Sequence, residues 1–139
     1  SRFTFEVAEQ DLADPSAPHL VTLKSLRDRG FRLCLDNFRV AAASLGTMER
    51  LPFDEIKIHA SAIRRAQNDP VRQKVLAAII GLAHSLDMTV CAEGIEDEVT
   101  FKFLKTINCD KMQGFVISEA VMPKLLRKFY GPGSSEAVA

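Results

Sequence analysis

Residues 69–94 read DPVRQKVLAAIIGLAHSLDMTVCAEG, and this stretch determines the class of fold. Asp69 followed by Pro70 is a typical helix start, because the aspartate can cap free N–H groups and proline fits the first helical turn. The apolar residues that follow recur at helical spacing and predict one buried stripe: Val71, Val75, Ala78, Ile79, Leu82 and Leu86. An apolar strand, Met88 to Ala92, comes next and ends at Glu93-Gly94. The stretch is therefore a helix that leads into a buried strand.

The same alternation of strands and helices extends to both sides of this stretch. The pattern predicts strands at residues 3–8, 31–35, 55–59, 88–92 and 112–117. It predicts helices at residues 20–30, 45–51, 70–86, 99–107 and 121–130. Such alternation implies parallel strands joined by right-handed crossovers. We expect residues 1–131 to form one α/β domain and residues 132–139, which are small and polar, to form a loose tail.

Two architectures fit this pattern: an open doubly wound sheet and part of a (β/α)₈ barrel. No glycine-rich phosphate loop follows the first predicted strand, which weakens the doubly wound, nucleotide-binding alternative. In a barrel, the carboxyl ends of the strands converge on one face, where catalysis takes place. The barrel is favoured because most apolar strand runs end in polar residues: Glu9, Asp36, Asn37, Lys57, His59 and Glu93.

Composition limits the classes of function. The chain has 18 Lys and Arg against 18 Asp and Glu and no run of basic residues, so we expect no binding of nucleic acid. The three cysteines form no pair at metal-ligand spacing and predict reduced, packed thiols. No apolar run reaches the length of a membrane span, and no signal peptide opens the chain. We therefore expect a cytoplasmic domain, either free or as the cytoplasmic part of a membrane-attached protein.

Six segments together resemble one known family. Residues 92–96 (AEGIE) are similar to the AEGVE motif of the EAL-domain family of cyclic di-GMP phosphodiesterases. Five more segments resemble that family in the same order: residues 5–9 (FEVAE), 35–38 (LDNF), 51–59 (LPFDEIKIH), 83–86 (AHSL) and 109–115 (CDKMQGF). Each match is weak alone, but the ordered set covers nearly the whole chain and is specific.

The resemblance implies a modified TIM (β/α)₈ barrel, of which this chain would be the C-terminal portion of about five β/α units. The Glu-Ala-Leu motif and a metal-ligating Asn of the family lie outside the part that this chain resembles. An incomplete barrel has two open edges, and open edges pair with other strands. We therefore expect a homodimer, or contacts with other protein domains, through these edges.

The family resembled here hydrolyses one phosphodiester bond of cyclic di-GMP to give pGpG and uses two divalent ions, Mg²⁺ or Mn²⁺. Two such ions activate a water and stabilise the charge that develops on the phosphate, and they need several carboxylate ligands. By resemblance, Glu9 and Asp36 are metal carboxylates and Lys57 lies near the attacking water and the phosphate. By the same resemblance, Glu93 is the catalytic glutamate, and Glu96 and Gln113 support the site.

Two substitutions predict a damaged metal site. Asn37 replaces the second Asp of the family's Asp-Asp pair, and His59 replaces the Asp of its K-I-D segment. The loss of anionic oxygens should weaken or abolish binding of the second ion, so Lys57 and Glu93 would be vestigial catalytic residues. His59 can either replace a metal ligand or serve as a hydrogen-bonded structural residue. Without metal, Lys57 and Glu93 would form an ordinary ion pair.

These features favour a degenerate EAL-like signalling module of a bacterial cyclic di-GMP pathway that is not catalytic. It would act either by sensing cyclic di-GMP or by protein interaction. One alternative is an active phosphodiesterase that hydrolyses cyclic di-GMP to pGpG with two metals. A third is a half barrel that serves only assembly. Function depends on the site and not on the fold, so the spatial arrangement of the site residues must discriminate among these.

Overall fold

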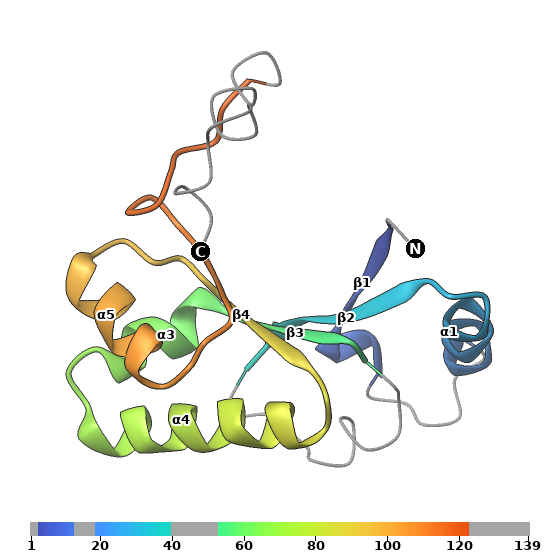
Figure 1. Cartoon of the computed structure of the whole chain (residues 1–139), viewed down its shortest axis with the longest axis horizontal. Helices are drawn as coiled ribbons and strands as arrows, with labels where there is room; N and C mark the ends of the chain where they lie inside the picture. Colours follow the sequence, from blue (N-terminus) through green and yellow to red (C-terminus); the bar gives the residue numbers. More distant parts are fainter. Residues whose placement is uncertain (1–2, 13–18, 40–52, 123–139) are drawn as a thin grey trace.

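The computed structural model describes residues 3–12, 19–39 and 53–122. Its elements follow one another in strand-and-helix order (Figure 1): β1 Thr4–Ala8, the 3₁₀ helix η1 Glu9–Leu12, α1 His19–Asp28, β2 Arg32–Phe38, β3 Glu55–Ile58, α3 Ala60–Ala66, α4 Pro70–Ser85, β4 Thr89–Glu93, α5 Glu98–Thr106 and β5 Lys111–Gln113. The predicted helix at residues 45–51, nearly all of that at 121–130 and the tail at 132–139 lie outside the described residues. None of the described helices is long and apolar enough to cross a membrane.

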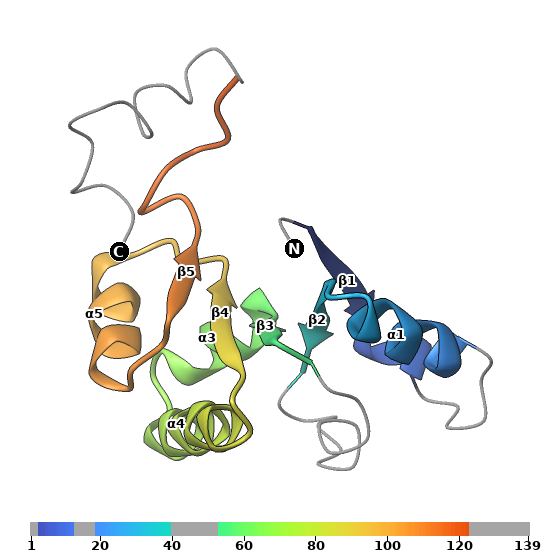
Figure 2. The ribbon, with the colours of Figure 1, turned by 45° about the vertical axis from the view of Figure 1, so that its right-hand side comes forward.

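The five strands form one parallel sheet in the order β1-β2-β3-β4-β5. Each strand lies beside its neighbour in sequence, so the strand order never reverses, as it does in a doubly wound sheet. Figure 2 shows the strands side by side across the molecule, with α1 near β1 and β2 and with α3, α4 and α5 toward the β4 and β5 end. Sequential parallel strands with intervening helices are the arrangement of a (β/α) barrel, so the predicted fold is confirmed for about five units.

The two faces of the sheet differ sharply in polarity, because side chains alternate along each strand. One face is apolar and belongs to the hydrophobic core: Leu33, Leu35, Ile56, Ile58, Val90 and Ala92 are all fully buried. The alternate residues on the three central strands form the other face: Cys34, Asp36, Glu55, Lys57, Cys91 and Glu93. This second face, which would line the interior of a barrel, therefore carries most of the charge.

The helix α4 has its predicted start but not its predicted buried stripe. The side chain of Asp69 accepts hydrogen bonds from the N–H groups of Val71 and Arg72, as expected for a helix cap. Val71 is nevertheless 70% exposed, and the residues that are buried are Leu76, Ile80 and Ala83. The predicted stripe was wrong along the whole helix, since Val75, Ala78 and Leu86 are exposed as well and Ile79 and Leu82 are only partly buried. Apolar residues occupy most of the circumference of this helix. Periodicity alone then leaves the buried side open, and the neighbouring elements decide it.

Two further elements differ from the prediction. The short helix α3 was not predicted, and β5 ends at Gln113 rather than at Ile117. Beyond Gln113 the backbone bonds to the loop that follows β4, since Ile95 N–H donates to the Gln113 carbonyl and Val116 N–H donates to the Ile95 carbonyl. The chain passes so close to this loop that a Cβ atom on Gly114 would lie 2.3 Å from the nitrogen of Ile95. The glycine thus permits the contact that ends the strand.

A bulge interrupts β2 where two of the candidate site residues lie. Leu35 pairs with Ile56 and Phe38 pairs with Ile58, so three steps along β2 match two steps along β3. Asn37 takes up the extra residue with a φ angle of +57°. Asparagine tolerates this left-handed conformation better than most residues. Such bulges redirect side chains at the end of a strand.

Candidate functional site

Four charged side chains from four adjacent strands meet on the polar face of the sheet, with Lys57 of β3 at their centre. Its Nζ atom lies 2.9 Å from an oxygen of Glu93, 3.2 Å from an oxygen of Glu6 and 3.8 Å from an oxygen of Asp36. Glu6, Asp36 and Glu93 belong to β1, β2 and β4. The cluster therefore spans most of the width of the sheet, and we call these four residues the Lys57 cluster.

The Lys57 cluster is partly shielded from solvent and carries a negative charge. The exposed fraction of the side chain is 15% for Lys57, 25% for Asp36, 24% for Glu93 and 51% for Glu6. Burial lowers the pKa of Lys57, but hydrogen bonds and charges from Glu93 and Glu6 outweigh it and hold that pKa above its usual value. The lysine is therefore a permanent cation. Three carboxylates around one ammonium group leave two formal negative charges.

Glu6 was not among the residues predicted from the sequence, and the sheet register explains why it belongs to the cluster. Glu6 pairs with Cys34, which precedes Asp36 by two residues, so all three side chains lie on one face of the sheet. The predicted Glu9 lies beyond the end of β1, in η1. Its carboxylate accepts the N–H of Arg39 at 3.2 Å and so contacts the segment that follows β2. No local signal separates Glu6 from Glu9, because the pairing of β1 with β2 decides which of the two faces Lys57.

The two substituted positions take part in local hydrogen bonds. The Asn37 side chain donates to Asp36 at 3.4 Å, directly beside the cluster. His59 precedes α3 and caps it: its Nδ1 accepts the N–H of Ser61 at 3.2 Å and lies 2.8 Å from the hydroxyl of the same residue. The geometry thus gives His59 a capping role in α3, and a role as a metal ligand stays a prediction.

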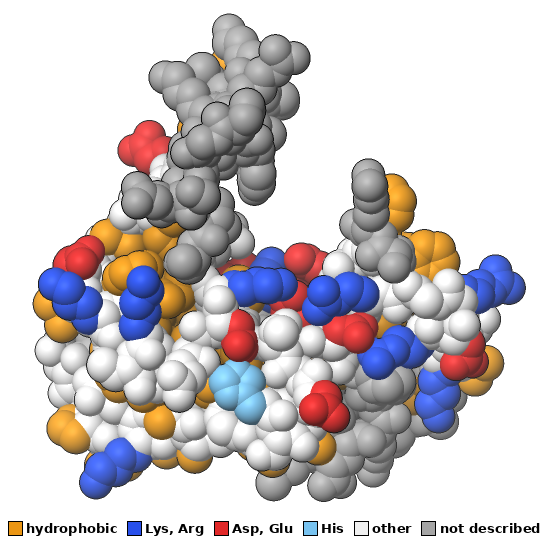
Figure 3. All heavy atoms as spheres, viewed as in Figure 1, with side chains coloured by type: hydrophobic (Ala, Val, Ile, Leu, Met, Phe, Trp, Pro, Cys, Tyr) orange, Lys and Arg blue, Asp and Glu red, His pale blue; other side chains and the backbone are white. Residues whose placement is uncertain are grey.

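The two predicted support residues have exposed side chains near the ends of β4 and β5. Glu96 is exposed in the loop between β4 and α5, and Gln113 has an exposed side chain at the end of β5. The Gln113 carbonyl accepts from Ile95, which ties β5 to the loop after Glu93. In Figure 3 acidic and basic side chains lie side by side over the strands, and hydrophobic and charged side chains lie together over α5.

The donor atoms of the Lys57 cluster suit a hard divalent cation in kind, since carboxylate oxygens are the ligands that Mg²⁺ and Mn²⁺ prefer. Their present spacing does not form a ready ligand set. Within residues 3–12, 19–39 and 53–122, no three Asp, Glu, His or Cys side chains lie together as metal ligands would. The carboxylates instead converge on the Lys57 ammonium group. The residues thus fit a divalent ion chemically but are arranged around an internal cation.

Comparison with known proteins agrees with this architecture. The family model of the EAL domain matches residues 1–120. A cyclic di-GMP phosphodiesterase of Pseudomonas aeruginosa is 34% identical over 115 residues, which are 83% of this chain and 19% of that protein. The structure of the MucR phosphodiesterase in complex with cyclic di-GMP matches with a TM-score of 0.78 and 31% identity, over 88% of this chain and 50% of that chain.

A second solved structure, Klebsiella pneumoniae BlrP1 with manganese and cyclic di-GMP, matches with a TM-score of 0.76 and 28% identity, over 84% of this chain and 30% of that chain. The chain spans between 15% and 19% of the length of the curated relatives that it matches. The family model covers far more than half of the chain, and the strand order is that of the predicted barrel. The chain belongs to the EAL domain family and is related to cyclic di-GMP phosphodiesterases.

Proposed function

We propose that this chain is a cyclic di-GMP-sensing signalling module that binds the dinucleotide through a divalent cation, Mg²⁺ or Mn²⁺, and does not turn it over at normal enzyme rates. The observation that carries the proposal is the convergence of Glu6, Asp36 and Glu93 on Lys57. Four charged side chains brought together from four strands, near the carboxyl ends where barrels bind ligands, suit a ligand site better than a purely structural surface.

The charge of the cluster explains why the cation is needed. Cyclic di-GMP carries two phosphate groups, and a site with two excess negative charges repels them. A divalent ion between the carboxylates and a phosphate would offset this repulsion, and Lys57 could then contact the phosphate. We propose Asp36 and Glu6 as the carboxylates that bind the ion, because both contact Lys57, whereas Glu9 accepts the N–H of Arg39.

Absence of normal turnover follows from the number of anionic ligands. Asn37 stands where the family has a second aspartate, and it offers a neutral amide at the bulge in β2. His59, in place of another family aspartate, is occupied in capping α3. Two dications side by side repel each other and need more carboxylate charge than these positions supply. We infer that a single ion binds and that the second, which hydrolysis requires, does not.

Calorimetry of the chain with cyclic di-GMP tests this proposal. We expect binding in the presence of Mn²⁺ and its loss in EDTA, with no pGpG formed over the same period. Glu6→Gln should abolish binding, whereas Glu98→Gln should not, because Glu98 is an exposed glutamate of α5 paired with Lys102. Binding that is indifferent to EDTA and to Glu6→Gln would overturn the role of the cation. Turnover of about 1 s⁻¹ or faster would overturn the non-catalytic reading.

Protein interaction is a second proposed role, and the edges of the sheet support it. In the described part of the chain, β1 and β5 each pair with one strand only. Phe5 of β1 is 42% exposed and packs edge-on against Phe31, with ring centroids 5.4 Å apart. An unpaired apolar edge favours pairing with another strand, from a second copy or another domain. Light scattering tests this role, and a monodisperse monomer over the accessible concentration range would contradict it.

We also propose a cytoplasmic location. The three cysteines are free and buried, as is usual where thiols stay reduced: Cys34, Cys91 and Cys109.

A further inference from the structure

The ammonium group of Lys57 occupies the point at which three carboxylates converge. A lysine ammonium group has three N–H donors and no acceptor. Lys57 directs this group at three separate carboxylates, with contacts to Glu93 at 2.9 Å, to both oxygens of Glu6 at 3.2 and 3.3 Å and to Asp36 at 3.8 Å. Without the ammonium group, three carboxylates would face one another across a partly shielded space and repel.

We propose that Lys57 acts as an internal cation that holds the place of a divalent metal in the metal-free chain, so that metal binding requires the ammonium group to withdraw from Glu6 and Asp36. This inference rests on the proposed divalent-cation site. It concerns the metal alone and does not need cyclic di-GMP to bind.

Geometry makes the two cations mutually exclusive at these oxygens. An Mg²⁺ ion holds its oxygen ligands at about 2.1 Å, and ions of similar chemistry bind at only slightly longer range. The oxygens of Glu6 and Asp36 now lie 3.2 and 3.8 Å from the ammonium nitrogen and would have to close around the ion instead. A dication and an ammonium group cannot share that space without strong repulsion.

Lys57 has the freedom to withdraw while its backbone stays fixed. Its strand, β3, pairs with both β2 and β4, so the backbone position is set by the ladders on either side. The lysine side chain is a flexible four-carbon stem that ends in a compact charge. Glu93 lies on the opposite side of Lys57 from β1 and β2, since it belongs to β4. The ammonium group can therefore keep its 2.9 Å contact with Glu93 and release the other two carboxylates.

Metal titration of matched lysine variants tests the inference. Lys57→Met removes the internal cation, and we expect it to tighten Mn²⁺ binding roughly tenfold or more, because a positive charge a few ångströms from the ion is gone. Lys111→Met is the control. It removes the same charge from the same face of the sheet, but Lys111 pairs with Glu55 at 2.7 Å rather than with a carboxylate of the Lys57 cluster. Its effect should stay below about threefold, because the Lys111 side chain is half exposed and solvent and salt screen its charge.

The loss of the free-ion Mn²⁺ signal in electron paramagnetic resonance measures these affinities in the absence of nucleotide. Tighter binding by Lys57→Met than by both Lys111→Met and the unaltered chain supports the inference. Equal effects of the two variants, weaker binding by Lys57→Met, or no Mn²⁺ binding by any of the three would overturn it. Failure of cyclic di-GMP to bind would instead count against the sensing role, so the two failures are distinguishable.

A measurement on the unaltered chain avoids any dependence on how the Lys57 variant folds. Acetylation with acetic anhydride, read by mass spectrometry, reports how accessible each lysine is. In EDTA, Lys57 should react slowly, since its side chain is only 15% exposed and is bound to three carboxylates. Mn²⁺ should speed the labelling of Lys57 and leave that of Lys111 unchanged. Labelling of Lys57 that does not change, or slows, on addition of Mn²⁺ would refute the exchange.

Discussion

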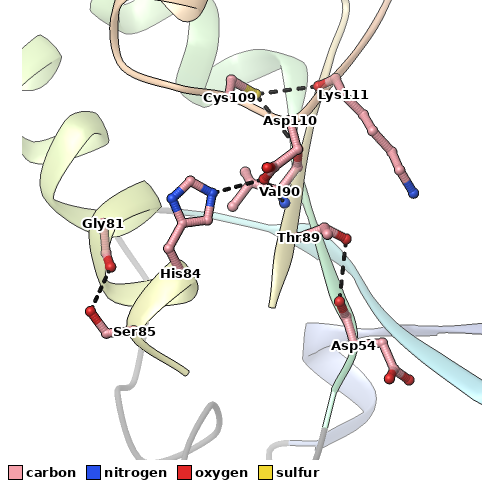
Figure 4. A network of polar contacts seen from close by, with 9 residues as sticks. All are labelled: Asp54, Gly81, His84, Ser85, Thr89, Val90, Cys109, Asp110 and Lys111. Carbon is pink, nitrogen blue, oxygen red and sulfur yellow. Dashed lines mark hydrogen bonds and ion pairs between the residues drawn. The ribbon is translucent and has the colours of Figure 1, made fainter. Parts of the chain in front are cut away.

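Asp110 lies at a junction between three elements, and its replacement provides the sharpest stability test of this structure. Figure 4 shows its carboxylate beside His84 of α4 and the backbone of β4. One oxygen accepts the N–H of Val90 at 2.7 Å and also lies 2.8 Å from Nε2 of His84. Cys109 contributes a thiol contact to the Val90 carbonyl at 3.7 Å. The segment before β5 therefore binds the start of β4 through both backbone polar groups of Val90.

The two hydrogen bonds of Asp110 should contribute different amounts to the free energy of unfolding. Val90 is fully buried, so Asp110→Ala leaves a buried N–H group without its acceptor, which costs about 2 kcal/mol. The contact with His84 is between two side chains that are each 35% exposed, and such pairs contribute about 0.5 kcal/mol. Asp110→Asn retains one amide oxygen that can accept the Val90 N–H, so we expect a loss of about 0.5–1 kcal/mol.

Thermal unfolding followed by circular dichroism provides the assay. Asp110→Ala loses both bonds, about 2.5 kcal/mol together, so at about 3–5 °C per kcal/mol for a domain of this size it should lower Tm by about 8–12 °C, and His84→Ala should lower it by no more than about 3 °C. The double variant should resemble Asp110→Ala, because the His84 contact is already lost in it. If His84→Ala is as destabilising as Asp110→Ala, or if Asp110→Asn is worse than Asp110→Ala, the assignment of the main effect to the Val90 N–H is refuted.

Three more predictions follow from the geometry around the site. Gly94→Ala should lower the free energy of unfolding by about 3 kcal/mol in chemical denaturation, because Gly94 has φ +68° and an added Cβ would lie 2.5 Å from the Cβ of Ala60. The control is Gly30→Ala, where φ is +81° but the space around an added Cβ is open, and it should cost about half as much. His59→Ala should lower stability by roughly 0.5–1 kcal/mol through loss of the α3 cap and leave Mn²⁺ affinity unchanged, and a clear drop in that affinity would make His59 a ligand. Burial raises the pKa of the thiols of Cys34, Cys91 and Cys109 above 9.0, so their contribution to stability is complete below pH 9.0 and is lost as the pH rises toward 11–12. The native chain should therefore resist thiol reagents at pH 8, and rapid labelling would contradict the packing of these cysteines.

Local sequence patterns predicted the order of the elements well. The Asp69-Pro70 helix start is a local signal, since a cap and its N–H partners lie within three residues of each other. The apolar runs that became β2, β3 and β4 were visible for the same reason, as their alternate residues are all buried on one side. The ends of elements were less predictable. The strand β5 stops where Gly114 meets Ile95, and that contact is between segments nearly twenty residues apart.

In the candidate site, too, some residues could be predicted from local sequence and others only from contacts between distant segments. Asp36, Lys57 and Glu93 could be selected from sequence because each follows an apolar run, and strand ends converge in a parallel sheet. The choice between Glu6 and Glu9 could not be made in this way, because both are acidic and both lie near the end of the first run. The register of β1 against β2 decides it, since pairing with Cys34 turns Glu6 toward Lys57.

By itself, the amino-acid sequence determined the alternation of strands and helices, the EAL-type barrel and most of the charged residues at the strand ends. These are properties of periodicity and of short segments, which act over a few residues. Only the tertiary structure decided which carboxylates surround Lys57, that His59 caps a helix, and which side of α4 is buried. Each of these depends on the register and packing of segments far apart in the chain, and no local pattern encodes the distance between two such segments.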